Sequence, residues 1–131
     1  MSSASPPEFF FDRSLGKETA HQLRESGWVI HVLADVFPDD AQEVPDEEWI
    51  AEGARRGWIL LTKDKRIRYR GHELAALHQG RLFCLASGNL TIAEMVSWLE
   101  AARGAITRAA ETERLGFWKV HRHGRLVRTW P

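Results

Sequence analysis

Acidic residues stand at three points of this sequence where an apolar segment meets a loop or a helix start. Asp12 closes an aromatic run, Asp46 and Glu47 open a segment of helical character, and Asp64 follows a second apolar run. Two carboxylates about 4 Å apart repel by roughly 4 kcal/mol at an effective dielectric of about 20, so a gathered set requires protons or a cation. Mg²⁺ and Mn²⁺ prefer carboxylate and water oxygens, and such an ion can activate water and neutralise a phosphate.

The elements around these acids predict that they meet at one edge of a sheet. Helical segments alternate with apolar runs typical of strands, and this alternation favours right-handed crossovers and a parallel sheet. Ligands of such sheets bind outside the carboxyl ends of the strands, where Asp12 and Asp64 stand. The expected strands are 8–11, 28–33, 58–61 and 81–86, and the expected helices are 14–26, 46–56, 72–78 and 91–114.

The remaining segments are interpreted as a tail, two connections and a hairpin. Residues 1–7 are rich in Ser and Pro and predict a disordered tail, which leaves 8–131 as a single domain. Residues 35–44 form a polar acidic loop and 65–69 a short turn. A C-terminal β-hairpin, 117–121 with 125–130, would lie in a basic extension at about 115–131.

Each acid also has an ordinary explanation. Asp12 and Asp46 could be helix caps, Glu47 could be a partner of the helix dipole, and Asp64 could be a turn residue. Their joint placement favours the metal site over these separate roles. Asn89 follows the fourth strand and could supply a neutral oxygen to the site, although Ser87-Gly88-Asn89 is also a typical turn.

Charge is distributed unevenly, although the formal net charge is zero. Eight acidic residues and no Lys or Arg occur between positions 35 and 52, whereas positions 103–131 hold seven basic residues and two glutamates. A basic run around Asp64 could contact phosphates or could be an exposed turn. Its members are Lys63, Lys65, Arg66, Arg68 and Arg70.

Other composition features indicate an ordinary cytoplasmic protein. Cys84 is the only cysteine, which excludes an intramolecular disulfide and a cysteine-rich zinc site. No segment approaches the roughly 20 apolar residues of a membrane span, and no secretory signal is visible, so we expect no membrane partner.

Three segments resemble the PIN-like domain, the fold of the VapC-type toxin ribonucleases. They are Phe10-Phe11-Asp12, Pro45-Asp46-Glu47-Glu48-Trp49, and Leu60-Leu61-Thr62-Lys63-Asp64-Lys65, and the resemblance covers roughly residues 9–99. The Thr-x-Asp that follows an apolar strand is the most specific of them.

The resemblance implies a three-layer α/β/α fold with a mainly parallel central sheet and a metal-dependent endoribonuclease activity. It implies that Asp12, Asp64 and either Asp46 or Glu47 bind Mg²⁺ or Mn²⁺. We further expect Thr62 to orient Asp64 by hydrogen bonding. It also implies a homodimer and an antitoxin protein encoded nearby. The hairpin lies outside the core shared by the family.

The sequence departs from the family pattern at one acid. A fourth carboxylate is expected after the fourth strand, where this chain has Ala86-Ser87-Gly88-Asn89. The alternative is therefore a PIN-like module that is catalytically weak or inactive and binds RNA or a protein partner.

Overall fold

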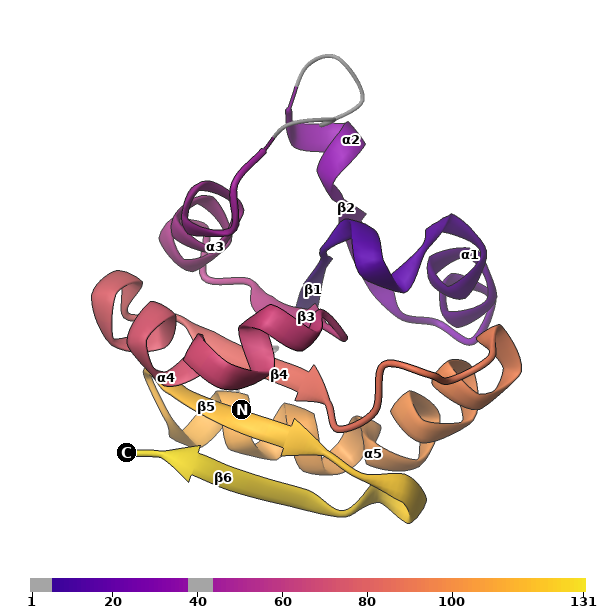
Figure 1. Ribbon diagram of the computed structural model, residues 1–131. Helices are drawn as coiled ribbons and strands as arrows, with labels where there is room; N and C mark the ends of the chain where they lie inside the picture. The colour runs from indigo at the N-terminus through magenta and orange to yellow at the C-terminus, as the bar shows by residue number, and fades with distance from the viewer. Residues whose placement is uncertain (1–5, 38–43) are drawn as a thin grey trace, which may run out of the picture.

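A six-stranded sheet with helices on both faces forms the molecule in the computed structural model, which describes residues 6–37 and 44–131 (Figure 1). The strand order is β2-β1-β3-β4-β5-β6, and all neighbours are parallel except β5 and β6. This confirms the expected α/β architecture. The strands are β1 (Glu8–Phe11), β2 (Val29–Val32), β3 (Ile59–Thr62), β4 (Arg81–Leu85), β5 (Gly116–Val120) and β6 (Leu126–Trp130).

The longer helices form two outer layers. Helices α1 and α5 contribute to the core on one face of the sheet, and α3 and α4 contribute to the core on the other (Figure 1). The helices are η1 (Arg13–Leu15), α1 (Lys17–Glu25), α2 (Leu33–Val36), α3 (Asp46–Arg55), α4 (Lys65–His78), α5 (Ile92–Thr112) and η3 (Arg122–Gly124).

The central strands are apolar at consecutive positions because both of their faces are buried. In β1, Phe9 and Phe11 enter the core beneath α1 and α5, whereas Phe10 enters the core beneath α3 and α4. All three side chains are at most 1% exposed. Strand β3 alternates in the same way, as expected for a parallel sheet covered on both sides.

The sheet topology brings the ends of β1 and β3 together. The chain passes from β1 outward to β2 and then returns to the other side of β1 for β3, so β1 and β3 flank a switch point where such sheets bind ligands. Phe11 pairs with Leu61, and the Asp12 N–H donates to the Leu61 carbonyl at 3.2 Å. This register places Asp12 beside Thr62.

The predicted helix 14–26 is wrong at its start. A 3₁₀ turn, η1, precedes α1, and the two are separated by Gly16, whose φ is +83°. The Asp12 carboxylate accepts a hydrogen bond from the Ser14 N–H at 2.7 Å and so closes this separate turn. The residues that follow Asp12 therefore remain beside the end of the sheet.

The predicted turn at 65–69 is also wrong, because α4 is one continuous helix. Asp64 is its N-cap and accepts a hydrogen bond from the Arg66 N–H at 2.8 Å. Gly71 lies within α4 and permits close contact with the sheet, since a Cβ at this position would lie 2.4 Å from the Phe117 ring.

Smaller differences concern the connection after β2. Strand β2 ends at Val32, and Leu33 begins the short helix α2, so the predicted strand 28–33 and the predicted loop 35–44 each include part of another element. Residues 38–43 of that loop and residues 1–5 of the expected tail lie outside the described residues.

The C-terminal hairpin is confirmed and belongs to the sheet. Strand β5 pairs in parallel with β4 from Gly116 to Val120, and β6 returns antiparallel to β5. Phe117, Trp118 and Val120 are buried. The hairpin therefore extends the central sheet.

Candidate metal centre

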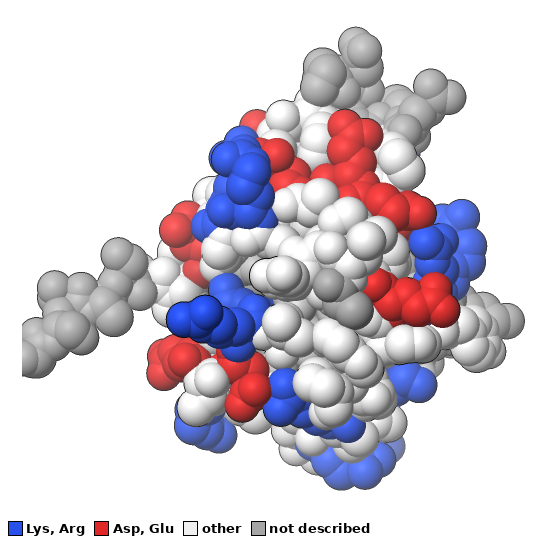
Figure 2. Space-filling model, turned by 90° about the vertical axis from the view of Figure 1, so that its left-hand side faces the viewer, with Lys and Arg blue, Asp and Glu red and all other residues white. Residues whose placement is uncertain are grey.

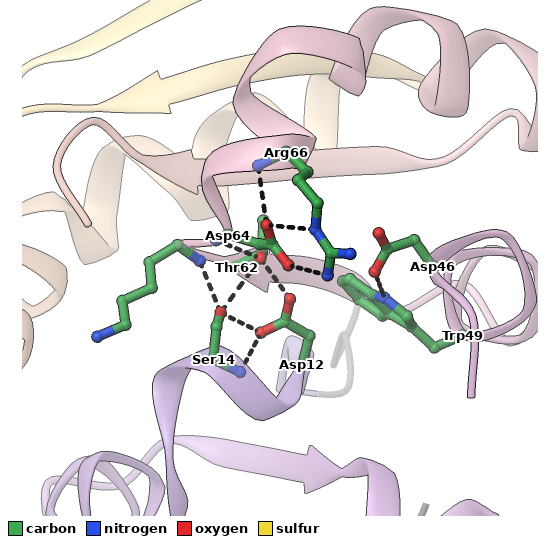
Figure 3. A network of polar contacts seen from close by, with 8 residues as sticks. Asp12, Ser14, Asp46, Trp49, Thr62, Asp64 and Arg66 are labelled. Carbon is green, nitrogen blue, oxygen red and sulfur yellow. Dashed lines mark hydrogen bonds and ion pairs between the residues drawn. The ribbon is translucent and has the colours of Figure 1, made fainter. Parts of the chain in front are cut away.

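Three carboxylates from three separate elements meet beyond the ends of β1 and β3 (Figure 3). Asp12 follows β1, Asp64 follows β3, and Asp46 is the first residue of α3. One oxygen from each carboxylate lies within 4.8 Å of the other two. Side chains that are far apart in sequence thus form one set of hard oxygen donors, a composition that suits Mg²⁺ or Mn²⁺.

The carboxylates open into a surface pocket of about 430 Å³. Asp12 lies at its inner side and is 6% exposed, whereas Asp46 and Asp64 are partly exposed. Leu33, Val44 and Trp49 provide apolar walls, and Arg13 and Arg66 also line the pocket. The pocket therefore leaves the carboxylates accessible to a ligand from solvent.

Burial dominates the electrostatics of Asp12. Loss of hydration raises the pKa of its carboxyl from 3.8 to about 6, against hydrogen bonds from Ser14 and Thr62 that lower it, and the negative charge of Asp64 raises it further. A carboxylate whose charged form is disfavoured in this way gains strongly from a nearby cation. The site is thus chemically suited to a divalent ion.

Two hydroxyl groups fix the Asp12 carboxylate (Figure 3). The Thr62 hydroxyl donates to Asp12 Oδ2 and accepts a hydrogen bond from the Asp64 N–H at 3.0 Å. The Ser14 hydroxyl donates to Asp12 Oδ1 and accepts a hydrogen bond from the Lys63 N–H at 3.1 Å. Thr62 thus contacts the backbone of Asp64 and the side chain of Asp12, and both hydroxyls connect Asp12 to the segment that follows β3.

Asp64 combines a structural role with its place in the cluster. Its Oδ1 accepts from the backbone N–H of Arg66, and its Oδ2 forms an ion pair with the Arg66 guanidinium at 3.0 Å. Arg66 is well exposed, with a side chain 79% accessible, so its contact with Asp64 is open to solvent. The pKa of Arg66 is raised, chiefly by its hydrogen bond to Asp64.

The two candidates at the start of α3 point in different directions. Asp46 joins the cluster, and its Oδ1 accepts a hydrogen bond from Trp49 Nε1 at 3.1 Å. It does not cap the helix, since Pro45 is the N-cap. Glu47 forms an ion pair with Arg70 at 2.9 Å, and the hydrogen bond from Arg70 lowers the pKa of the Glu47 carboxyl. The geometry therefore brings Asp46, rather than Glu47, to Asp12 and Asp64.

Among the described side chains of the basic run after β3, Arg66 and Arg70 form ion pairs with acidic residues. Arg66 pairs with Asp64, Arg70 pairs with Glu47, and Lys63 is half-buried with its backbone N–H on Ser14. The side chains of Lys65 and Arg68 lie outside the described part of the structure. Figure 2 shows one face of the molecule, where Lys and Arg are interspersed with Asp and Glu and do not gather into one basic patch.

Asn89 lies in the loop after β4 and stays apart from the carboxylates. It is exposed, and its backbone N–H donates to the Ser87 hydroxyl at 3.2 Å. Within the part of the chain that the structure describes, Asn89 does not line the acidic pocket. This hydrogen bond between Asn89 and Ser87 is local and agrees with the interpretation of Ser87-Gly88-Asn89 as a turn.

Two residues of the site were missed from the sequence. Ser14 stands two residues after Asp12. At this spacing an Asp side chain often binds a backbone N–H, so the sequence contained a signal that Ser14 contacts Asp12. Trp49 stands three residues after Asp46, and such positions are neighbours on a helix surface.

Comparison with known proteins agrees with this geometry. A model of the PIN like domain family matches residues 7–87, which include β1 to β4 and all three carboxylates. A protein of Mycobacterium tuberculosis (strain ATCC 25618 / H37Rv), named "Putative ribonuclease VapC45", is 34% identical over 116 residues, which are 86% of this chain and 84% of that protein. No solved structure matches the chain.

Of the helices in residues 6–37 and 44–131, none has both the length and the apolar character that crossing a membrane requires.

The family match spans more than half of the chain, and the relative spans most of it. The chain therefore belongs to the family of PIN-like domains and is of the VapC type.

Proposed function

We propose that this protein is a metal-dependent endoribonuclease and the toxin of a toxin–antitoxin pair. The observation that carries the proposal is the convergence of Asp12, Asp46 and Asp64 at the switch point of the sheet. The relative named as a ribonuclease supports RNA as the substrate. The antitoxin, a homodimeric state and action in the cytoplasm are the further parts of this proposal.

Each residue of the site has a distinct part in the proposed reaction. Asp12, Asp46 and Asp64 would hold the ion, and Thr62 and Ser14 keep the Asp12 carboxylate turned toward it. A bound Mg²⁺ or Mn²⁺ would supply an activated water and neutralise the charge of the scissile phosphodiester. Arg66 at the pocket wall, with Lys63, Lys65 and Arg68 near it in sequence, would offer positive charge to the RNA backbone.

One variant tests the proposal directly. Purified protein with Mn²⁺ should cleave RNA, EDTA should stop the cleavage, and Asp64→Asn should lower the rate by at least about a hundredfold because a metal ligand is lost. Glu25→Gln, which alters an exposed acid at the end of α1, serves as the matched control and should retain activity. Equal cleavage by the wild type and Asp64→Asn would refute the proposed activity.

A second candidate function is a PIN-like module that has little or no catalysis and binds RNA or a protein. The segment after β4, Ala86-Ser87-Gly88-Asn89, favours it because no carboxylate stands there. Among the described residues, the acidic group contains three carboxylates. RNA binding without Mn²⁺-dependent cleavage would support this second function over the first.

A further inference from the structure

A second pocket adjoins the acidic pocket on the side of α2. Its volume is about 280 Å³, and Asp12, Arg13 and Leu33 line both pockets. The two pockets therefore share a wall at the end of β1. A molecule bound at the carboxylates can extend into the second pocket without leaving the protein surface.

The lining of the second pocket combines apolar and basic residues. Val32, Leu33 and Ala34 line it from the end of β2 and from α2, and Arg13 and Lys17 line it from η1 and the start of α1. Gly16, which also lines the pocket, would meet no atom within 4 Å if it carried a Cβ, so this part of the wall is open. A pocket with both apolar and basic lining suits a planar, mostly apolar group that is attached to an anion.

We propose that this pocket holds the base of the nucleotide next to the scissile phosphate and so determines which RNA sequence is cut. The proposal rests on the ribonuclease activity proposed above, since that activity places a phosphodiester at Asp12. The base contacts Val32 and Ala34, while Arg13 and Lys17 face the adjoining phosphate. Among single-stranded ligands, bases bind such apolar surfaces and phosphates bind such cations.

Ala34 provides the sharpest test because it lines the pocket, is exposed and lies outside the carboxylate cluster. Ala34→Trp should fill the pocket without disturbing the core, and Ala34→Ser should leave it open. Ala93→Trp, at an exposed alanine of α5, controls for the added indole on the surface. Thermal unfolding followed by circular dichroism checks that each variant is folded.

Binding is measured in the Asp64→Asn background with EDTA, so the result does not depend on catalysis. The probes are four fluorescein-labelled RNA pentamers, each of one base, and the readout is fluorescence anisotropy. The parent should prefer one base. Ala34→Trp should weaken binding of that RNA by at least about fivefold and remove the preference, since the added indole takes the place of the base in the pocket. Ala34→Ser and Ala93→Trp should bind like the parent.

Two results would overturn the proposal. One is a parent that binds all four RNAs equally or binds none of them. The other is an Ala34→Trp variant that binds and discriminates like the parent. If Ala34→Trp in the protein with an intact Asp64 also escapes inhibition by the protein encoded beside it, the pocket belongs to a protein partner. Failure of the ribonuclease proposal is recognised separately, by wild-type protein that does not cleave RNA with Mn²⁺.

Discussion

At the scale of single residues, the Asp12 carboxylate is held in a position that is unfavourable without a cation. Burial raises its pKa to about 6, although Thr62 and Ser14 both donate hydrogen bonds to it. Asp12 also caps the turn η1, so it has a structural role as well. In the proposed function, a bound cation would favour the charged form of this carboxyl.

This raised pKa predicts how stability depends on pH in metal-free protein. The folded pKa of Asp12, about 6, lies above the ordinary value of 3.8, so its contribution to stability is fully present below about pH 4 and is lost as pH rises through 6. Between pH 7 and pH 4.5, the wild type should gain about 2 kcal/mol relative to Asp12→Asn. Urea unfolding in EDTA at several pH values measures the difference, and parallel pH profiles of the two proteins would contradict it.

A second prediction separates the two neighbouring acids of α3. Asp46→Asn should lower Mn²⁺-dependent cleavage by at least about tenfold because Asp46 lies in the cluster. Glu47→Gln removes only an exposed ion pair with Arg70 and should change the rate by less than about threefold. The cleavage rates of both variants are measured at saturating Mn²⁺. A larger loss for Glu47→Gln than for Asp46→Asn would assign the metal site to Glu47.

The sequence identifies only part of the site. Asp12 and Asp64 are predictable because both follow apolar strands, and parallel strands bring their carboxyl ends to one edge. The choice between Asp46 and Glu47 is not predictable in the same way, because it depends on which helix face meets α4. In the structure α3 buries Trp49, Ile50 and Gly53, and Glu47 pairs with Arg70 across the two helices.

At the scale of elements, glycines set how closely α4 approaches the sheet. A methyl group at Gly71 would lie 2.4 Å from the Phe117 ring, so Gly71→Ala should destabilise the protein by about 1–3 kcal/mol. At Gly104 of α5, a Cβ meets only the mobile end of Arg108 at 3.1 Å, so Gly104→Ala should stabilise by up to about 1 kcal/mol. Urea unfolding of both variants measures these values, and equal effects would contradict this packing.

Two glycines, Gly71 and Gly16, lie where the predicted elements differ from the observed ones. The predicted helix 72–78 began after Gly71, but in the structure Gly71 lies inside α4, where the absence of a side chain allows close contact with β5. Gly16 truly interrupts a helix, because its φ of +83° is a conformation that other residues avoid. The sequence alone does not distinguish a glycine that ends a helix from one that packs.

The capping signals were more reliable than the glycines. Thr91-Ile92-Ala93-Glu94 has the sequence pattern of a capping box, and Thr91 and Glu94 form it reciprocally, with hydrogen bonds of 2.8 and 3.1 Å. This motif is local, so its geometry follows from residues close in sequence. Helix α5 accordingly begins at Ile92, close to its predicted start.

At the scale of the whole molecule, the C-terminal hairpin is part of the core. The Trp118 ring stacks on Phe83 of β4 with centroids 4.5 Å apart. Trp118→Ala should therefore destabilise the protein by about 3–5 kcal/mol, whereas Trp130→Ala, at a half-buried position of β6, should cost less. Thermal unfolding measures the loss of stability in the two variants. Similar losses of stability in both would show that the hairpin packs differently.

The fold and the site are connected through the order of the strands. Placing β1 between β2 and β3 creates the switch point, and the long-range pairing of β1 with β3 sets Asp12 beside Thr62. The fold thus brings three carboxylates together, and we propose that they bind one divalent ion.

Calorimetric titration of the metal-free protein with Mn²⁺ tests this claim most directly. The wild type should bind one Mn²⁺ per chain, and Asp12→Asn and Asp64→Asn should bind at least about tenfold more weakly because each lacks one charged ligand. Glu25→Gln should bind like the wild type. A wild type that shows no binding, or an Asp64→Asn variant that binds Mn²⁺ equally well, would contradict the account.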